Sequence, residues 1–477
     1  MTHKVWRRCA MFMEIIRNIN GIFWGWLVAG ILLIFGMFIT MRLKFPQIRY
    51  FSKLITNLSA KNSTKGGVSG FGALCAAVGA EVGTGSLVGV ATALASGGPG
   101  AIFWMWITSL LGMPIIFSEA VLGQVFRVKN DDGTYRGGPA YYMSKGLHSR
   151  LLATLFSISL IIGIGCIYVM IQSNSIATSV TGIVDYHPGI VGIGLMILVA
   201  LVIFGGIKRL AEVASYVVPF MALIYLLLAL FVIFTHLHAF FDMIWLIISS
   251  ALGIGQVAGG VAGYTVQQAF RYGIARGLFS NDAGNGTTPS MHAAANVKHP
   301  VNQGLNGMLG CFVTTIVVCS CTAFCILLSG ELSSGATGIQ LTQAAFAVSF
   351  GDCGKWIVFF AMFLFGYTTL LADIYYGEVN LSYLIPKGGK KLITLWRIFS
   401  CLLIIVGACL PVPSLWEMAD FSTAFMVFFN IIALVGLSRY VVFVLKDYET
   451  KKKHQETPEW NYDISVIDQY NAAKNDR

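Results

Sequence analysis

Residues 79–89 read GAEVGTGSLVG and lie within an apolar stretch that runs from Gly70 to Ala95. The stretch is long enough to cross a bilayer as a helix, which takes about 20 residues. Glycine weakens helices, yet it recurs at the centre of this one, beside a glutamate, Glu81. Unwound backbone at membrane depth is tolerated only where it faces protein or a water-filled cavity. The stretch therefore predicts either a binding site or close helix packing through small residues.

The composition places the whole chain in a membrane. Of its 477 residues, 56% are hydrophobic and only 11% are charged. A soluble domain carries about 25% charged residues, so a soluble fold of this size is excluded. The net charge of +10 comes from short connections between apolar segments, which is typical of membrane orientation and not of nucleic-acid binding. Most cysteines lie inside apolar runs and form no C-x-x-C pair, so neither disulfides nor a zinc site are predicted.

Hydropathy predicts an all-α polytopic protein with about eleven membrane-spanning helices. The candidate spans are residues 22–42, 70–95, 100–126, 151–180, 189–205, 210–235, 244–278, 302–329, 355–385, 392–411 and 413–445. The segment 244–278 is too long and too rich in glycine to be one uniform helix. Lysine and arginine concentrate in the connections after the odd-numbered spans, which predicts an outer N-terminus and a cytoplasmic C-terminus. Only the basic residues of the N-terminal segment, which would lie outside, disagree with this orientation.

A second glycine-rich segment, GIGQVAGGVAG (253–263), lies about five spans after the first. Paired interrupted helices at matching places in two halves are typical of transporters built from inverted repeats. The predicted repeats are residues 70–236 and 237–446. They are preceded by an outer segment (1–21) and an extra helix with its cytoplasmic loop (22–69), and followed by a cytoplasmic tail (447–477).

The ninth span contains FGYTTLLADIYYGE (365–378), with adjacent hydroxyls at Thr368 and Thr369. Helix threonines commonly bond to their own backbone. Beside an interrupted helix, however, their oxygens are candidate sodium ligands, because hard cations prefer oxygen donors.

Six stretches together resemble one known family. They are GTGSLVGVATALASGGPGAIFWMW (83–106), RGGPAYYM (136–143), IQSNSIA (171–177), GIARGLFSNDAGNGTTPSMHAAA (273–295), HPVNQGLNGM (299–308) and YYGEVN (375–380). In this order, they resemble the alanine or glycine:cation symporter family, the sodium:alanine symporters. The resemblance implies a leucine-transporter-type fold of five plus five helices with one extra N-terminal helix. It also implies import of a small amino acid, such as alanine or glycine, coupled to sodium and in some members to protons.

The resemblance also implies a binding site. The substrate carboxylate is expected at the backbone amides of Gly83, Thr84 and Gly85, and the amino group at Gly259, Gly260 and Gly263. Gln172 is either a polar contact to the substrate or a helix–helix hydrogen bond. Sodium is expected at the carbonyls of Gly79, Val82 and Phe365 and the hydroxyls of Thr368 and Thr369. The stretch 279–289 is expected to shape the inner gate and not the pocket.

Three residues depart from the family pattern: Ser86, where an asparagine is usual, Glu81 and Asp373. Charges inside membrane spans are costly and are functional candidates by default. Each carboxylate either lines the pocket or has a structural role. If both line it, the hypothesis is a larger polar or cationic substrate, such as glutamine, or a carboxylate that couples proton movement.

The spans contain no nucleophile–base pair or metal-ligating cluster, so an enzyme is not predicted. No cofactor is expected beyond the co-transported sodium ion. The expected partners are an amino acid, sodium or a proton, and the lipid bilayer of the cell membrane. An ion channel and a nutrient sensor without transport stay open as alternative classes.

Overall fold

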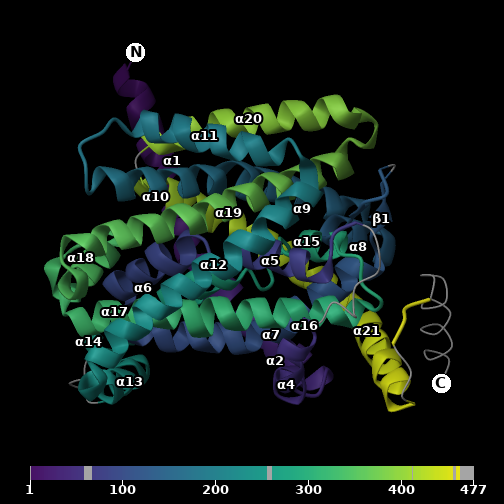
Figure 1. The fold of residues 1–477 in the computed structure, drawn as a ribbon, viewed down its shortest axis with the longest axis horizontal. Helices are drawn as coiled ribbons and strands as arrows, with labels where there is room; N and C mark the ends of the chain where they lie inside the picture. The colour runs from purple at the N-terminus through teal and green to yellow at the C-terminus, as the bar shows by residue number, and fades with distance from the viewer. Residues whose placement is uncertain are drawn as a thin grey trace.

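The fold is a bundle of helices, seen in the computed structural model of Figure 1. The structure describes residues 2–58, 67–130, 132–254, 260–410, 412–454 and 458–461. Within that part, the one sheet is a hairpin of β1 (Val128–Lys129) and β2 (Tyr135–Arg136), with Val128 opposite Arg136. Long apolar runs satisfy their backbone groups only as helices in a membrane, which explains this uniformity.

The first half of the chain forms α1 to α12. The helices are α1 (Thr2–Ile22), α2 (Val28–Arg42), α3 (Pro46–Arg49), α4 (Phe51–Thr56), α5 (Gly70–Glu81), α6 (Val90–Gly97), α7 (Gly100–Val125), α8 (Pro139–Gly146), α9 (Arg150–Ile162), α10 (Val169–Thr181), α11 (Pro188–Ile203) and α12 (Gly206–Thr235). Three π-helical turns join neighbouring helices: η1 (Phe23–Leu27), η3 (Gly85–Gly89) and η4 (Gly163–Tyr168).

The second half forms α13 to α21. The helices are α13 (Leu237–Leu252), α14 (Gly260–Asn281), α15 (Pro289–Ala294), α16 (Pro300–Cys311), α17 (Ser320–Ser329), α18 (Gly338–Phe350), α19 (Asp352–Leu384), α20 (Gly389–Cys409) and α21 (Val412–Lys453). The π-helical η5 (Phe312–Cys319) joins α16 to α17, and η6 (Glu331–Ser334) and η7 (Pro386–Gly388) are 3-10 turns.

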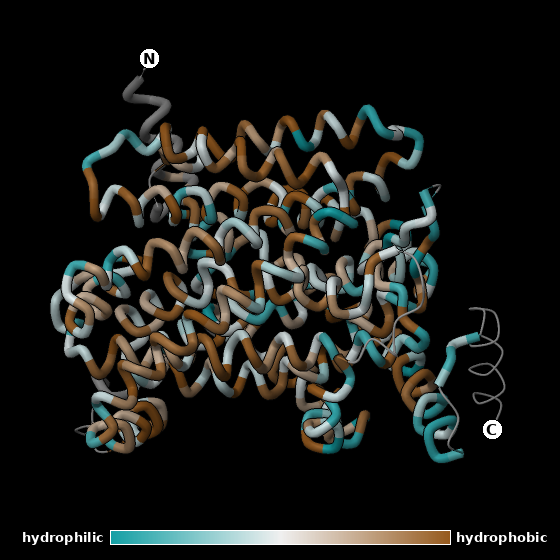
Figure 2. The backbone as a smooth tube through the Cα atoms, viewed as in Figure 1, coloured by the Kyte–Doolittle hydropathy of each residue, from teal (hydrophilic) through white to brown (hydrophobic). Residues whose placement is uncertain are grey.

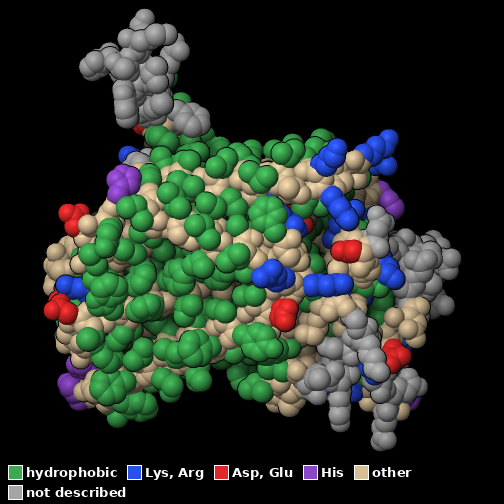
Figure 3. All heavy atoms as spheres, turned by 45° about the horizontal axis from the view of Figure 1, so that its top comes forward, with side chains coloured by type: hydrophobic (Ala, Val, Ile, Leu, Met, Phe, Trp, Pro, Cys, Tyr) green, Lys and Arg blue, Asp and Glu red, His purple; other side chains and the backbone are tan. Residues whose placement is uncertain are grey.

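The surface of the bundle suits a bilayer. Apolar residues run along the middle of the helices and polar residues lie at both ends of the view (Figure 2). The space-filling view shows a broad hydrophobic face, with lysine and arginine gathered toward the end where α8 and β1 lie (Figure 3). Among the described residues, seven helices are long and apolar enough to cross a membrane, or eight with the bent pair of α5 and η3–α6. The chain is therefore a polytopic membrane protein.

The glycine-rich stretch 79–89 interrupts its helix as predicted. α5 begins at the N-cap Ser69, whose side chain accepts a hydrogen bond from the Gly72 amide at 3.0 Å. It ends at Glu81, and η3–α6 continues at an angle of 43°. We call α5 and η3–α6 together the first interrupted helix. A Cβ on Gly83 would lie 2.4 Å from Thr369 Oγ1, so glycine is required here by the close approach of α19.

The predicted span 244–278 is not one helix. α13 ends where Gly253 adopts a left-handed conformation, and α14 begins at Gly260. A further interruption, which the sequence analysis did not place, lies beyond α14 at residues 282–288. Asp282, Gly284 and Gly286 there have φ of 55°, 92° and 77°. We call α14, this loop and α15 the second interrupted helix.

Candidate functional site

The break in the first interrupted helix frees backbone groups inside the bundle. Val82 leaves the helical conformation with φ −81° and ψ 55°. The Thr84 amide, predicted to bind a carboxylate, donates to Gln172 Oε1 at 3.2 Å. The Ser86 carbonyl accepts from Thr322 Oγ1 at 2.8 Å. Gln172, on α10, therefore holds an amide of the break in place, which is the helix–helix hydrogen bond that the sequence offered as one of its two roles.

Oxygen atoms from two helices meet beside this break. Both Thr368 Oγ1 and Thr369 Oγ1 lie within hydrogen-bond distance of the Gly79 carbonyl, at 3.0 and 2.9 Å. The same hydroxyls lie 3.0 and 2.9 Å from the Phe365 carbonyl. Val82, predicted in the same set, is fully buried at the adjacent break. We call these four atoms of Gly79, Phe365, Thr368 and Thr369 the oxygen cluster, a donor set that suits a hard cation.

A small cavity lies between the two interrupted helices. Its volume is about 10 Å³, which is room for about one water molecule. The lining residues are Ala80, Glu81, Gly83, Gly85, Tyr168, Gln172, Phe279, Asp282, Thr369 and Asp373. The structure thus brings the predicted residues Gly83, Gly85 and Gln172 to one cavity. The cavity is nearly closed.

Three buried carboxylates line this cavity. Glu81 Oε2 accepts a hydrogen bond from Thr314 Oγ1 at 3.1 Å. Gly310 leaves space for the Glu81 side chain, because a Cβ on Gly310 would lie 2.9 Å from Glu81 Oε2. Glu81 Oε1 and Asp373 Oδ2 have no hydrogen-bond partner among the described residues. Asp282 Oδ1 accepts from Asn285 Nδ2 at 2.8 Å. Glu81 and Asp373 therefore do face the region where the sequence predicted the pocket.

The loop of the second interrupted helix is held by a buried carboxylate. Glu119, on α7, accepts from the Gly286 amide at 3.0 Å and the Gly284 amide at 3.1 Å. Asn430 on α21 donates to Glu119 at 2.5 Å and to the Gly284 carbonyl at 2.9 Å. The role of Glu119 here is to fix the loop that carries Asp282 into the cavity.

Two residues predicted for the substrate amino group lie elsewhere. Gly260 and Gly263 lie in the first turn of α14, whereas Phe279 near its other end lines the cavity. The 16 residues from Gly263 to Phe279 span about 24 Å of helix. Gly259, predicted with them, lies outside the described residues. The structure therefore does not bring Gly260 and Gly263 to the cavity.

The stretch 279–289, expected at the inner gate, instead contributes Phe279 and Asp282 to the cavity lining. A signal for this break is present in the sequence N-D-A-G-N-G (281–286), because glycine, asparagine and aspartate tolerate left-handed backbone. Tyr168, on η4, is the other lining residue that the sequence did not indicate.

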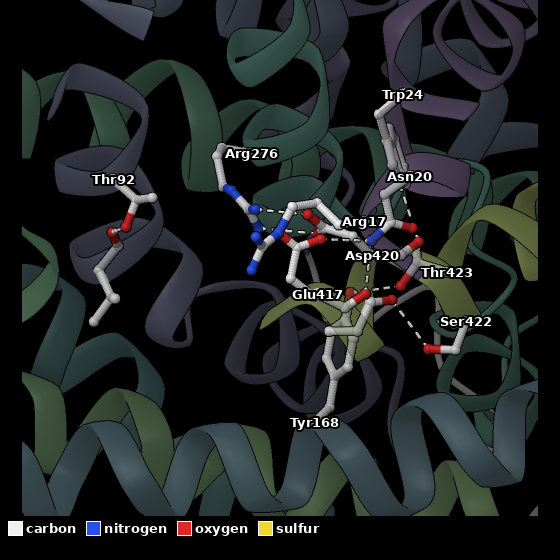
Figure 4. Close-up of polar contacts among 12 residues, drawn as sticks. Arg17, Asn20, Trp24, Thr92, Tyr168, Arg276, Glu417, Asp420, Ser422 and Thr423 are labelled. Carbon is white, nitrogen blue, oxygen red and sulfur yellow. Dashed lines mark hydrogen bonds and ion pairs between the residues drawn. The ribbon is translucent and has the colours of Figure 1, made fainter. Parts of the chain in front are cut away.

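An aromatic layer lies beside the cavity, next to the ion pair of Arg276 and Asp420 that Figure 4 shows. The Phe279 ring contacts the rings of Tyr168 and Trp416, each with centroids 4.8 Å apart. One turn earlier on α14, Arg276 forms a two-pronged ion pair with Asp420 of α21, at 2.8 and 3.2 Å. The Arg276 side chain is buried in this pair.

The N-terminal segment joins this network. Trp24 Nε1 donates to the Asp420 carbonyl at 3.0 Å, and Asn20 Nδ2 donates to Glu417 Oε2 at 2.9 Å. Arg17 lies 3.6 Å from Glu417 (Figure 4). The end of α1 and η1 therefore packs on the same end of α21 that pairs with α14.

An apolar helical bundle, two interrupted helices and a closed polar cavity at their breaks define a membrane transporter of the secondary type. A sequence model of the sodium:alanine symporter family matches residues 9–462. The chain belongs to this family, which is a family of transporters and not of enzymes.

Relatives cover nearly the full chain. The probable sodium/glutamine symporter GlnT of Bacillus subtilis is 38% identical over 454 residues, which are 94% of each protein. The sodium/alanine symporter AgcS of Methanococcus maripaludis is 36% identical over 458 residues, 93% of this chain and 99% of the relative. Among solved structures, the manganese transporter of Eremococcus coleocola shares the fold, with a TM-score of 0.51 and 13% identity over 85% of each chain.

Proposed function

We propose that this protein is a sodium-coupled symporter that imports a small amino acid, such as alanine or glycine, by alternating access. The observation that carries the proposal is the oxygen cluster of Gly79, Phe365, Thr368 and Thr369 beside a helix break. Sodium at this cluster would join α5 to α19. The substrate would bind in the adjacent cavity between the two interrupted helices.

The proposed architecture is eleven spans, with an extra N-terminal helix before two five-helix inverted repeats. The helix α14 with its loop and α15 would form one span, equivalent to the first interrupted helix. The N-terminus would lie outside and the C-terminus in the cytoplasm, since lysine and arginine gather toward the end with α8 and β1 (Figure 3).

In the proposed binding mode, the amides of Gly83, Thr84 and Gly85 receive the substrate carboxylate. The Thr84 amide bonds to Gln172 at 3.2 Å, so the carboxylate would replace or join this side chain. The Phe279 and Asp282 end of the second interrupted helix, and not Gly260 and Gly263, would face the amino group. Sodium next to a carboxylate and a helix break lowers the cost of burying the substrate's charge.

The second candidate function is carriage of a larger polar or cationic amino acid, with or without proton coupling. Two observations favour it: a relative is named a probable sodium/glutamine symporter, and three carboxylates line the cavity. Both candidates share the sodium site and differ in the side chain of the substrate.

Radiolabelled uptake into proteoliposomes, with a panel of amino acids and with sodium or potassium outside, tests the proposal. The expected result is uptake of at least one amino acid that needs sodium and is accelerated by unlabelled substrate inside. Flux without this trans-stimulation would favour a channel. Amino-acid binding without any flux would favour a sensor.

A further inference from the structure

The cavity has more acidic side chains than a zwitterionic substrate needs. Three of its ten lining residues are carboxylates, and the lining includes no lysine, arginine or histidine. The nearby base Arg276 does not compensate them, because both of its terminal nitrogens bond to Asp420. Buried carboxylates are costly unless a positive charge or hydrogen bonds accompany them.

Of the three, Asp373 has the least support from the protein. Glu81 accepts a hydrogen bond from Thr314 at 3.1 Å, and Asp282 accepts one from Asn285 at 2.8 Å. Asp373 is only 3% exposed, and its Oδ2 has no hydrogen-bond partner among the described residues although it lines the cavity. A group with these properties calls for a partner from outside the chain.

Asp373 also has a defined position relative to the oxygen cluster. It lies one turn beyond Thr369 on the same face of α19, a rise of about 6 Å. A substrate whose carboxylate lies at the break near Gly83 would direct its side chain along this face. Because a Cβ on Gly83 would lie 2.4 Å from Thr369 Oγ1, this break lies about one helical turn from Asp373.

We infer that the substrate carries a second cationic group on its side chain, as in a diamino acid, and that Asp373 pairs with that group. This inference rests on the second candidate function, sodium-coupled carriage of a polar or cationic amino acid, and it specifies the substrate class within that candidate. Asp373 would then determine specificity, and Glu81 and Asp282 would lower the electrostatic energy of the cation.

The test is a competition series on the full-length protein in proteoliposomes with an inward sodium gradient. Unlabelled competitors are 2,3-diaminopropionate, 2,4-diaminobutyrate, ornithine, lysine, glutamine and alanine, against whichever labelled amino acid is taken up. At least one diamino acid is expected to compete at a concentration tenfold or more below that of glutamine or alanine. In Asp373→Asn, this preference is expected to fall at least tenfold. Asp352→Asn, at a fully exposed carboxylate that lies beside Lys355, is the matched control and is expected to keep it.

Each other outcome overturns the inference and shows whether the proposed symport fails with it. Sodium-driven uptake of neutral amino acids without competition by any diamino acid contradicts it and leaves the proposed symport intact. Neutral uptake whose pH dependence disappears in Asp373→Asn would mean that Asp373 takes a proton instead. Absence of sodium-dependent uptake of every amino acid would remove the proposed function itself. The wild-type competition series decides the matter even if Asp373→Asn does not fold.

Discussion

At the scale of single residues, two hydroxyls carry the proposed sodium site. Thr368 and Thr369 are buried, and each lies within hydrogen-bond distance of carbonyls from two helices. The contacts with Phe365 are the bonds to the preceding turn that helix threonines commonly make, whereas the contacts with Gly79 join two helices. The contact with Gly79 across to α5 is the feature that points to a cation.

The first prediction concerns Thr369→Val, which keeps the shape of the side chain and removes the oxygen. A hydrogen bond or ligand to a charged group contributes about 1.5–3 kcal/mol, so the sodium concentration for half-maximal uptake should rise about 10- to 100-fold. Uptake measured over a sodium series checks this. Thr394→Val is the control, because the Thr394 hydroxyl is exposed and bonds only to Lys390 of its own helix. An unchanged sodium requirement in Thr369→Val would exclude Thr369 as a ligand.

The sequence indicated these residues because the break, the paired threonines and the carboxylates stand out as exceptions to the apolar pattern. It did not indicate Thr314, which donates a hydrogen bond to Glu81, or Gly310, which leaves space for the Glu81 side chain. It also did not indicate Tyr168, which lines the cavity. A threonine, a glycine and a tyrosine are ordinary residues in membrane helices. Their role depends on which helix lies opposite, and periodicity within one helix does not contain that information.

At the scale of helices, the ion pair of Arg276 and Asp420 connects α14 to α21 beside the cavity. Their side chains are 5% and 18% exposed. The Arg276 guanidinium also lies 4.6 Å from the centre of the Trp416 ring. Since Trp416 contacts Phe279, the pair and the aromatic layer form one connected wall of the closed cavity.

Removing one partner of this pair leaves an uncompensated buried charge. We predict that Arg276→Met or Asp420→Asn lowers the free energy of unfolding by about 3 kcal/mol each. The double variant Arg276→Met/Asp420→Asn should lose less stability than the sum of the two single losses, because no lone charge remains. Denaturation of the purified proteins in detergent gives the free energy of unfolding of the wild type, the two single variants and the double variant. Asp352→Asn, which breaks an exposed pair with Lys355, should change stability by less than about 1 kcal/mol. Additive effects of the two single changes would show that the residues are not coupled.

Helix existence could be predicted from hydropathy, and the first break from glycine content. The second break was harder to place, since two glycine-rich candidates follow each other along the chain. The segment 253–263 has more glycine, but the loop 282–288 is the one that Glu119 holds against the cavity. A buried carboxylate on α7 thus distinguishes the two candidates. That residue is 165 positions away in sequence from Gly284.

At the scale of the whole molecule, the C-terminal part of the chain docks onto the connection between the second interrupted helix and α16. The Trp460 amide donates to the Lys298 carbonyl at 2.8 Å, and Glu459 lies 3.4 Å from Lys298 Nζ. The neighbouring Asn296 amide donates to the Val68 carbonyl at 2.8 Å, just before α5. One connection therefore holds the start of the first interrupted helix, the end of the second and the C-terminal segment.

His299 lies at the centre of this junction as a neutral imidazole. Its Nδ1 accepts from the Val301 amide at 3.2 Å, and its Nε2 lies 3.1 Å from Asp447 Oδ2. Burial lowers the pKa of His299 below its ordinary value, and the hydrogen bond to Asp447 opposes this effect only in part. A proton on Nδ1 would place a donor against the Val301 amide and break this arrangement.

The stability of the junction should therefore depend on pH. Because the pKa of His299 is lower in the folded state, the unfolded chain binds the proton more tightly. The stabilisation is complete above about pH 7 and is lost as pH falls below about 6.5, the unfolded value. The melting temperature of the purified protein should decrease over this range. In His299→Gln, which cannot be protonated, this part of the decrease should be absent. The same pH profile in both proteins would contradict the assignment.

The central claim is that sodium and an amino acid cross the membrane together. The most direct measurement is the flux of radioactive sodium into proteoliposomes that have equal sodium on both sides and an inward gradient of the transported amino acid. The account predicts that the amino-acid gradient alone drives net sodium uptake, and that Thr369→Val lowers this uptake about tenfold or more at a sodium concentration below half-saturation of the wild type. Entry of the amino acid without any movement of sodium would contradict the account.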